Sequence, residues 1–375
     1  MPTQHFDVAI AGAGPAGAAA ARRLRRSGCR VVLLERSGFN APRIGESLAP
    51  ATQPLLRELG VWSEFESLSP LPSYGTRSAW GSSDVTDHSH VMSPYGCGWH
   101  VDRLAFDRML VAAAAAAGVD VRTDTSLLHC EMAGDGRWML HVATRDARGP
   151  ALLRARVLID ATGRSAHVGR GLGAERHLFD RLVGVATLFA DVDTSRQGYV
   201  LVETARDGWW YSAPLPGGRM IAMLMTDGDL CGRGRVCTPA AWHERLADAP
   251  ATTARVAGTA RWGPHVFSAL SQRLQRRDRD APWIAIGDAA LAVDPITGSG
   301  VVRALRSARA GSEAALALLG GAVRHVVDAY EVERDQECAS YLRERTLYYG
   351  AEQRWQESPF WRQRSEYPQM LDYAT

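Results

Sequence analysis

A glycine-rich turn near the N-terminus, Gly12-Ala13-Gly14-Pro15-Ala16-Gly17, constrains the fold of this chain more than any other feature. The segment before it, His5 to Ala11, has the apolar character of a buried strand, and Pro15 to Gly28 has the composition of a helix. A second apolar strand, Val31 to Leu34, follows and ends at Glu35. The sequence therefore predicts a βαβ unit with the glycines at its first turn, an arrangement that binds a dinucleotide.

The residues of this turn have separate physical roles. Gly12 allows the tight turn, Gly14 lets the backbone approach a pyrophosphate, and Gly17 allows helix and strand to pack closely. The helix starts at Pro15, which carries no N–H, and the free N–H groups that follow from Ala16 onward offer hydrogen bonds and a partial positive charge to the phosphates. The glutamate at the end of the second strand is placed to bind a ribose hydroxyl. This motif alone does not separate FAD from NAD.

A second motif near the C-terminus decides between the two dinucleotides. Pro282 to Ile286 has the pattern of a buried strand that ends at Gly287-Asp288, where the carboxylate is placed to bind a ribityl hydroxyl. Pro295 and Thr297-Gly298-Ser299-Gly300 then open a long helix, Val301 to Leu319. The N–H groups of Gly298, Ser299 and Gly300 would stabilise negative charge on the pyrimidine edge of a reduced flavin. Together the motifs predict one FAD gripped at both ends, and hence a redox enzyme.

Composition excludes several classes of function. A chain of 375 residues suffices for two domains, and its formal net charge of +2 does not suggest nucleic-acid binding. No apolar stretch is long enough to span a membrane and the N-terminus runs straight into a strand, so we expect neither a membrane span nor a signal peptide. The six cysteines lack CxxC or framework spacing, which fits a reducing compartment and a cytoplasmic location. All 43 basic residues are arginine, so lysine chemistry is excluded.

The strand and helix patterns divide the chain. We expect an α/β fold in which a Rossmann-like FAD-binding domain of the glutathione-reductase type carries an antiparallel substrate sheet. The FAD-binding domain is predicted to be discontinuous, at residues 1–72, 99–165 and 280–320. The substrate domain takes residues 73–98 and 166–279, and a C-terminal helical segment takes 321–375, with 351–375 as a polar, aromatic tail.

Finer patterns lie within these domains. A helix is expected to run from Val101 to Ala117 with Asp102 as a plausible N-cap. Three alternating stretches, 119–131, 136–144 and 151–159, predict a β-meander on the FAD-binding domain. No second GxGxxG follows a strand, so the reductant is either transiently bound NAD(P)H or a partner flavin reductase.

The motifs together resemble the single-component flavoprotein monooxygenases. The residues that carry this resemblance are the glycine turn, Val101-Asp102-Arg103 with Phe106-Asp107, Asp160-Ala161-Thr162-Gly163, and Gly287-Asp288 with Pro295 and Gly298-Ser299-Gly300. Gly45-Glu46-Ser47 and the segment from Gly208 to Pro214 are similar to the branch that contains the flavin-dependent halogenases. Tyr211 replaces the second Trp of the halogenase pattern, Ala213 replaces its Ile, and the halogenase lysine is missing.

Within this branch the chain most resembles the maturation flavoproteins of the lysine-oxidase and glycine-oxidase type, which share a segment like Trp-Trp-Tyr-Ser-Ala-Pro-Leu-Pro at 209–216. The resemblance implies a monooxygenase that uses FAD and O₂ to hydroxylate an electron-rich ring through a flavin hydroperoxide. It implies a tryptophan of a quinoprotein oxidase precursor as substrate, in tryptophylquinone biogenesis. A small-molecule aromatic hydroxylase, a halogenase disfavoured by the missing lysine, and a flavin reductase or assembly factor remain as alternatives.

Several further residues are predicted to meet the cofactor, namely Glu35, Arg36, Arg43, Glu46, Ser47, Arg103, Gly163 and Val301. Trp209 and Tyr211 alternate with Trp210 along a strand, so Trp209 and Tyr211 share one face.

We predict that Trp209 and Tyr211 line the pocket as catalytic residues, with plain core packing as the alternative. Glu46 is a candidate proton acceptor or flavin contact, and an inert exposed acid is the alternative. His100 lies near the expected flavin edge, but a lone histidine is more often structural. His88 and His90 are expected in a solvated loop, and no metal site is predicted.

Overall fold

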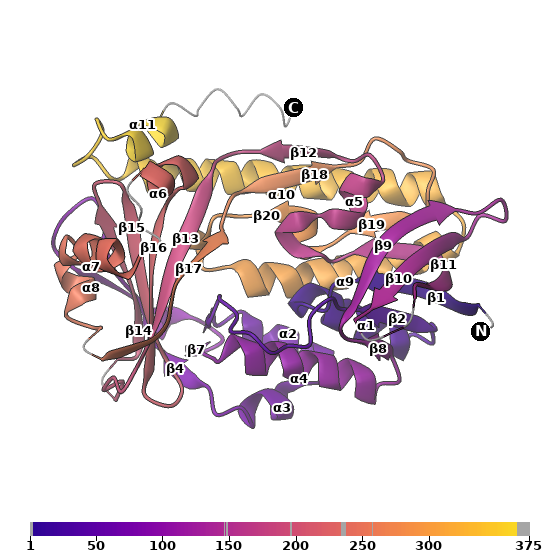
Figure 1. The fold of residues 1–375 in the computed structure, drawn as a ribbon, viewed down its shortest axis with the longest axis horizontal. Helices are drawn as coiled ribbons and strands as arrows, with labels where there is room; N and C mark the ends of the chain where they lie inside the picture. Colours follow the sequence, from indigo (N-terminus) through magenta and orange to yellow (C-terminus); the bar gives the residue numbers. More distant parts are fainter. Residues whose placement is uncertain are drawn as a thin grey trace.

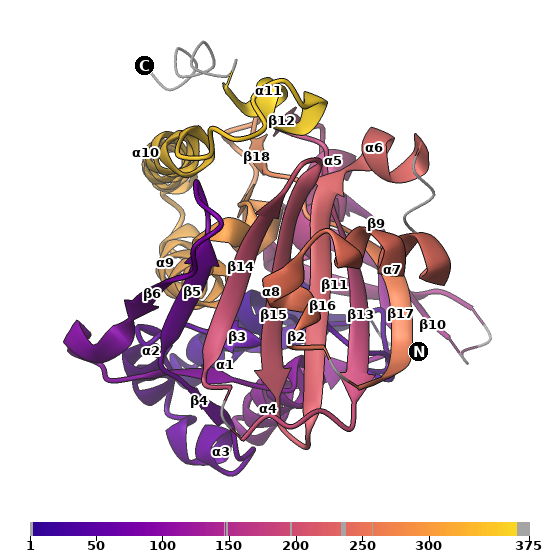
Figure 2. The same ribbon diagram turned by 90° about the vertical axis from the view of Figure 1, so that its left-hand side faces the viewer.

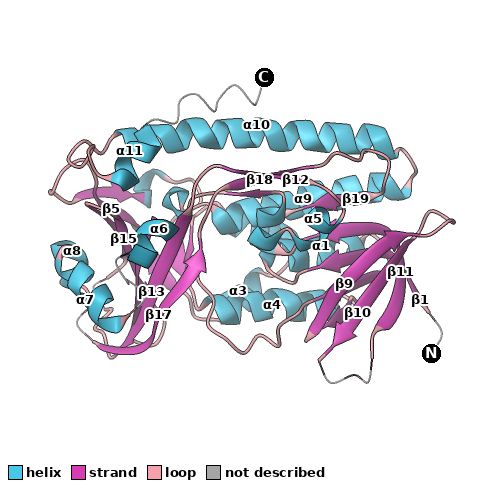
Figure 3. Ribbon diagram, turned by 45° about the horizontal axis from the view of Figure 1, so that its top comes forward, coloured by secondary structure: helices cyan, strands magenta, loops and turns pink. Residues whose placement is uncertain are grey.

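The computed structural model describes residues 3–145, 147, 149–195, 197–233, 238–256 and 258–365. It consists of a nucleotide-binding half with helices on its sheet, and a half dominated by a large antiparallel sheet (Figure 1). The long helix α10 (Val323–Gly350) runs along both halves (Figure 3). This arrangement confirms the predicted α/β fold with a Rossmann-like FAD-binding part.

The sheet of the first half, called here the nucleotide sheet, has seven strands. Its main order is β8 (Asp120–Arg122), β2 (Val31–Leu34), β1 (Gln4–Ala11), β11 (Ala151–Asp160), β10 (Trp138–Thr144) and β9 (Thr125–Met132). The seventh strand, β19 (Trp283–Ala285), pairs in parallel with the second half of β11, whereas the first half of β11 pairs with β10. Strand β11 therefore brings the two predicted FAD motifs together, because β1 lies on its other side.

Apolar residues explain these central strands. All of β2 and the end of β1 are buried, as expected for parallel strands with both faces covered. The covering helices are α1 (Pro15–Arg26), α4 (Arg103–Ala116) and α9 (Gly300–Leu319). The side chain of Asp102 accepts a hydrogen bond from the amide of Ala105, which confirms its role as the N-cap of α4.

The predicted strand at 119–131 is corrected by the structure. Its first part is β8, which pairs with β2 at the far edge, and only its second part, β9, joins the meander. The backbone of Asp124 between them has φ of 49°, a left-handed conformation that interrupts the strand. Hydrophobic alternation continued through this break, so the pattern alone did not reveal it.

The second half is built on a seven-stranded sheet, called here the substrate sheet (Figure 2). Its order is β17 (Thr259–Ser268), β13 (Leu182–Ala190), β16 (Arg219–Asp227), β15 (Gly208–Leu215), β14 (Tyr199–Ala205), β5 (Gly75–Ala79) and β6 (Thr86–Ser89). All neighbours are antiparallel except β14 and β5. One face of the sheet is covered by short helices, α6 (Gly228–Arg233), α7 (Pro239–Ala247) and α8 (Pro250–Thr253).

Smaller elements connect the two halves. A three-stranded sheet consists of β3 (Ser47–Leu48), β7 (Gly98–His100) and β4 (Leu71–Ser73), and another of β12 (Glu175–Leu178), β18 (Gln272–Gln275) and β20 (Leu291–Ala292). The remaining helices are α2 (Thr52–Leu59), α3 (Trp62–Glu66), α5 (His167–Gly171) and α11 (Pro359–Ser365). Short 3₁₀ turns occur at His90–Met92, Gly163–Ser165, Gly287–Ala289 and Pro295–Thr297. These elements contact both halves, so they do not mark a boundary between two domains. The predicted domain boundaries stay a prediction.

The first part of the predicted polar, aromatic tail packs against the rest of the protein through its aromatic residues. Phe360 and Trp361 of α11 are 0% and 3% exposed, and they pack with Tyr349 of α10 against the substrate sheet. Burial of these large aromatic rings is strongly favourable, which explains why the chain folds back. Residues 366–375 of the predicted tail lie outside the described residues. In the described part of the chain, none of the helices has both the length and the apolar character of a membrane span.

Candidate functional site

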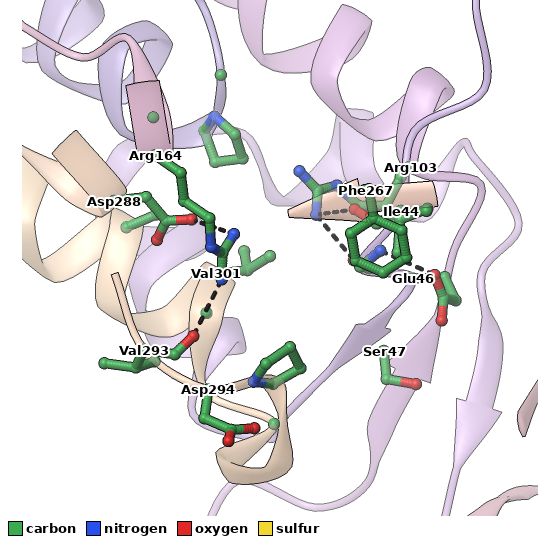
Figure 4. Close-up of a pocket in the computed structure, with 18 of the residues that line it drawn as sticks. Ile44, Glu46, Ser47, Arg103, Arg164, Phe267, Asp288, Val293, Asp294 and Val301 are labelled. Carbon is green, nitrogen blue, oxygen red and sulfur yellow. Dashed lines mark hydrogen bonds and ion pairs between the residues drawn. The ribbon is translucent and has the colours of Figure 1, made fainter. Parts of the chain in front are cut away.

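Two cavities meet at the glycine-rich turn and form one long groove. The larger, about 490 Å³, lies beside β1 and β2, and the other, about 300 Å³, lies between the nucleotide sheet and the substrate sheet. They share Gly14, Ala161 and Gly163 in their walls. We call them the adenosine cavity and the flavin cavity, after the parts of FAD that the sequence assigns to them. Figure 4 shows the flavin cavity.

The glycines of the turn test whether a dinucleotide fits. A Cβ on Gly12, whose φ is 101°, would lie 2.2 Å from the Ala161 carbonyl oxygen, and one on Gly17 would lie 1.9 Å from the Gly12 oxygen. A Cβ on Gly14 would meet nothing within 4 Å. Gly12 and Gly17 are therefore required by the fold, whereas Gly14 faces the groove where a phosphate needs close approach. The turn fits the predicted cofactor.

The adenosine cavity contains three of the predicted polar residues, Glu35, Arg36 and Arg43. The Glu35 carboxylate accepts hydrogen bonds from the amide of Ala13, at 2.9 Å, and from the hydroxyl of Ser37, at 2.6 Å. Arg43 lies 3.7 Å from the same carboxylate. Glu35 thus ties the glycine turn to the end of β2 while it lines the cavity.

A buried carboxylate, Asp107 of α4, holds two arginines that belong to different cavities. It lies 2.8 Å from Arg43 of the adenosine cavity and 3.2 Å from Arg103 of the flavin cavity. Arg103 also donates to the carbonyl oxygens of Ile44 and Gly45, at 3.0 and 2.9 Å. Asp107 therefore fixes the loop that carries Glu46.

The start of α9 forms one side of the flavin cavity. Pro295, Gly298, Gly300 and Val301 line it, and Gly298 is left-handed with φ of 58°. The free N–H groups of this helix start give the cavity a positive end that suits an anionic flavin edge.

Three predicted cofactor residues line neither cavity: Gly17, Gly287 and Ser299. Gly287 donates its amide to Ser307, and its own Cβ would crowd Ala16, so it serves the packing of helix and strand. The Ser299 hydroxyl lies 2.8 Å from that of Thr297. Gly17, Gly287 and the Ser299 hydroxyl therefore serve the packing of the protein itself. Contacts between their backbone and a cofactor stay a prediction.

Asp288 lines the flavin cavity as predicted and pairs with Arg164 at 2.7 Å (Figure 4). Arg164 also donates to the Val293 carbonyl oxygen at 3.0 Å. The sequence interpretation missed Arg164, although it directly follows the Asp-Ala-Thr-Gly turn, which was a usable signal.

The substrate sheet supplies the opposite wall. Trp209 and Tyr211 line the flavin cavity, whereas Trp210 points to the other face and packs on Trp242, with ring centroids 5.1 Å apart. This confirms the predicted alternation along β15. Met223 and Met225 of β16 and Phe267 of β17 complete the wall. These three residues were not predicted from the sequence, although Met223 and Met225 share one face of β16 with period two.

Glu46 is buried in the cavity wall, only 2% exposed, which rules out an inert exposed acid. One carboxylate oxygen accepts from the amide of Gly45 at 2.8 Å, and the other makes no hydrogen bond to any described residue. Burial raises the pKa of Glu46, and contacts with Gly45, Tyr211 and Arg103 offset only part of that effect. A neutral, proton-carrying Glu46 is therefore favoured over a range that extends above its ordinary pKa.

A line of polar groups runs from this wall to His100. The Ser47 hydroxyl lies 2.8 Å from the Tyr211 phenol oxygen and 3.0 Å from Nδ1 of His100. His100 is fully buried, and its Nε2 has no partner among the described residues. Burial and the nearby Arg255 lower the pKa of His100 to about 3, so its ring is neutral at physiological pH.

The two other predicted histidines lie apart from the cavities. His88 is exposed but lies on strand β6 and not in the predicted loop, and Nδ1 of His90 lies 3.2 Å from the carbonyl oxygen of Ser73. Across the described ranges, no three His, Cys, Asp or Glu side chains gather closely enough to hold a metal ion.

Known proteins are similar to this chain over most of its length. The profile of the FAD binding domain family matches residues 5–344. LodB of Marinomonas mediterranea is 30% identical over 365 residues, which cover 96% of this chain and 97% of that protein. The 1H-pyrrole-2-carbonyl-(peptidyl-carrier protein) chlorinase of Pseudomonas fluorescens is 25% identical, over 83% of this chain and 76% of that protein.

Two solved structures place the fold. The myxobacterial chondrochloren halogenase CndH superposes with a TM-score of 0.88 at 24% identity, over 99% of this chain and 89% of that chain. QhpG, a peptidyl tryptophan dihydroxylase essential for tryptophylquinone cofactor biogenesis, superposes with a TM-score of 0.71 at 25% identity, over 97% of this chain and 79% of that chain.

Proposed function

Because the chain belongs to the FAD binding domain family and is an FAD-dependent oxidoreductase of its monooxygenase and halogenase-like branch, we propose that it hydroxylates the indole of a tryptophan in a partner protein. The partner would be a quinoprotein oxidase precursor, and the reaction would belong to the maturation of its quinone cofactor. The electron donor would be NAD(P)H or a partner flavin reductase.

The observation that carries this proposal is the wall formed by Trp209, Tyr211 and Phe267, which faces the start of α9 across the flavin cavity. An electron-rich ring placed between them has aromatic neighbours on one side and the redox cofactor on the other. Aromatic rings pack favourably on one another in offset or edge-on geometry, so this wall would orient an indole. The likeness to QhpG, a peptidyl tryptophan dihydroxylase, supports a protein-bound tryptophan over a free metabolite.

When bound and reduced, FAD supplies two electrons and activates dioxygen. One oxygen atom then replaces a ring hydrogen as hydroxyl, and the other leaves as water with two protons. The side chains of Met223, Met225 and Phe267 give this space an apolar lining, which would limit the access of water to a bound ring.

Glu46 and Tyr211 are the groups that move protons in this proposal. Burial also raises the pKa of Tyr211 well above its ordinary value, so the phenol keeps its proton and can donate it. The free oxygen of Glu46 lies in the cavity wall, and the Ser47 hydroxyl connects the phenol to the neutral imidazole of His100.

The five cysteines described in the structure carry free thiols, which supports a reducing, cytoplasmic setting for the reaction.

Halogenation is the second candidate, because chlorinase and halogenase relatives share the fold. The chain contains no lysine, and Tyr211 occupies the place of the halogenase tryptophan. These two differences favour hydroxylation.

The experiment is a turnover assay with purified holoprotein, NAD(P)H, a flavin reductase and a tryptophan peptide from a candidate quinoprotein precursor. Hydroxylation adds one or two oxygen atoms to that tryptophan and consumes an equal number of O₂ molecules, seen by peptide mass spectrometry and oxygen uptake. Parallel reactions contain chloride or bromide. Halogen in the peptide would make the protein a halogenase, and flavin oxidation without any product on peptide or free indole would make it a reductase or assembly factor.

A further inference from the structure

Trp209 starts a continuous series of aromatic side chains that leaves the flavin cavity. Its ring centroid lies 6.2 Å from that of Trp80, and its indole N–H donates to the Tyr349 hydroxyl at 3.1 Å. The rings of Trp80 and Tyr349 are themselves 5.9 Å apart. The cavity wall is thus joined to two further oxidisable rings, one on the β5 hairpin and one on α10.

Both branches converge on Trp361 of α11. Its ring lies 5.5 Å from Trp80 and 5.9 Å from Tyr349. Trp361 in turn stacks on Trp355, with centroids 6.2 Å apart, and Trp355 is half-buried at the surface of the C-terminal segment. Every neighbouring pair is within the range of direct aromatic contact.

We propose that these five residues, Trp209, Trp80, Tyr349, Trp361 and Trp355, form an aromatic relay that carries single oxidising equivalents from the flavin cavity to the protein surface. The proposal rests on the proposed function, because it requires FAD in the cavity and activated oxygen beside Trp209. Tryptophan and tyrosine are the rings that lose an electron most readily in proteins. The relay would therefore rescue the enzyme when no substrate ring is present to react.

The electron balance of each step is simple. The oxidant is a hydroxyl radical, formed together with hydroxide when hydrogen peroxide from uncoupled turnover takes one electron from reduced flavin; the radical then takes one electron from Trp209 and becomes hydroxide. Trp80 or Tyr349 then donates one electron to the Trp209 radical. Trp361 donates one electron to the oxidised Trp80 or Tyr349, and Trp355 donates one electron to the oxidised Trp361. A reductant in solution, such as ascorbate or a thiol, returns one electron to Trp355.

Tyr349 has the proton acceptor that its oxidation requires. Its hydroxyl donates to the carboxylate of Asp294 at 2.6 Å, and Asp294 is fully buried. When Tyr349 loses an electron its proton passes to Asp294, and the proton returns when the electron is restored. Trp355 carries the guanidinium of Arg354 over its face at 4.3 Å, so an electron vacancy there would end as the deprotonated, neutral radical.

The same sheet provides the comparison for an ordinary aromatic core. Trp210 is as buried as Trp209, but it contacts Trp242 on the other face of β15, away from the flavin cavity. Trp210→Phe is therefore the matched control for loss of a buried indole. Trp361→Phe is the test variant, because both branches pass through this residue.

The experiment is flash photolysis of the holoprotein, in which photoexcited oxidised FAD is the oxidant and tryptophan-radical absorption is the readout. In the wild type and in Trp210→Phe, the radical should be long-lived, since the vacancy moves to Trp355, and external ascorbate should shorten its life. In Trp361→Phe, the vacancy stays on Trp209, Trp80 or Tyr349, so its lifetime should fall by an order of magnitude and depend less on ascorbate.

A chemical map gives the second readout. After reduction by NAD(P)H in air without substrate, peptide mass spectrometry should find oxidised tryptophan at Trp355 in the wild type and at Trp209 or Trp80 in Trp361→Phe. Equal lifetimes and equal maps in wild type and Trp361→Phe would overturn the relay. If Trp361→Phe does not fold, Trp355→Phe, at the half-buried end, gives the same comparison.

These results are separable from failure of the proposed function. A protein without bound FAD gives no radical signal on photolysis, and this result contradicts both proposals. A protein that binds FAD but hydroxylates no tryptophan contradicts the proposed function alone, because photolysis still tests the relay.

Discussion

The Ser47 hydroxyl lies 2.8 Å from the Tyr211 phenol oxygen, although 164 residues separate them in the chain. This contact joins the nucleotide-binding half to the substrate sheet at the wall of the flavin cavity. It gives the phenol a fixed orientation and connects it to His100.

Tyr211→Phe should therefore slow hydroxylation without loss of flavin. General acid–base assistance is worth at least roughly a hundredfold in rate, and we expect a fall of that size in kcat. Flavin absorbance should stay normal, because the ring and its packing remain. The rate of product formation in a single turnover checks the chemical step. If this rate and kcat were unchanged in the variant, Tyr211 would not take part in proton transfer.

Glu46 should make stability depend on pH. Burial raises its pKa in the folded protein above the ordinary 4.5, so the folded state keeps this proton after the unfolded chain has lost it. Its contribution to stability is complete below pH 4.5 and is lost as pH rises through the raised pKa. Glu46→Gln should remove this loss, so that the variant gains stability relative to the wild type as pH increases. Urea unfolding at a series of pH values checks the difference, and parallel curves for the two proteins would contradict it.

Asp288→Ala should weaken FAD binding. The carboxylate faces the flavin cavity, and a hydrogen bond to a charged group is worth about 1.5–3 kcal/mol, or roughly ten- to a hundredfold in Kd. Asp280→Ala is the control, because Asp280 forms an exposed pair with Arg324 far from the groove. Titration of apoprotein with FAD measures both; normal yellow holoprotein from Asp288→Ala would refute the ribityl assignment.

Gly14→Ala and Gly17→Ala should fail in different ways. A methyl on Gly17 collides with the Gly12 oxygen at 1.9 Å, so this variant should lose about 1–3 kcal/mol of folding stability. A methyl on Gly14 meets no protein atom within 4 Å, so the fold should persist while FAD affinity falls. Thermal unfolding of the apoproteins separates the two. If Gly14→Ala bound FAD like the wild type, the pyrophosphate would not lie at this turn.

The sequence predicted the fold well where a local pattern of residues is compatible with only one backbone geometry. The glycine turn, the strand ending at Asp288 and the alternation of Trp209, Trp210 and Tyr211 all follow from backbone geometry and period. It did not predict Arg164 or Phe267, because their importance depends on which distant segments the fold brings together. It also did not predict that Phe360 and Trp361 of the polar, aromatic tail are buried, because their contacts depend on the substrate sheet, which is distant in the sequence. The remaining site assignments stay predictions.

Asp107 has a consequence that extends along the whole groove. A single carboxylate pairs with Arg43 at one end of the groove and with Arg103 at the other. A ligand that draws one guanidinium away from Asp107 therefore strengthens the ion pair between Asp107 and the other arginine. An adenosine fragment and a flavin fragment would then influence each other's affinity without touching, by the same factor in either direction.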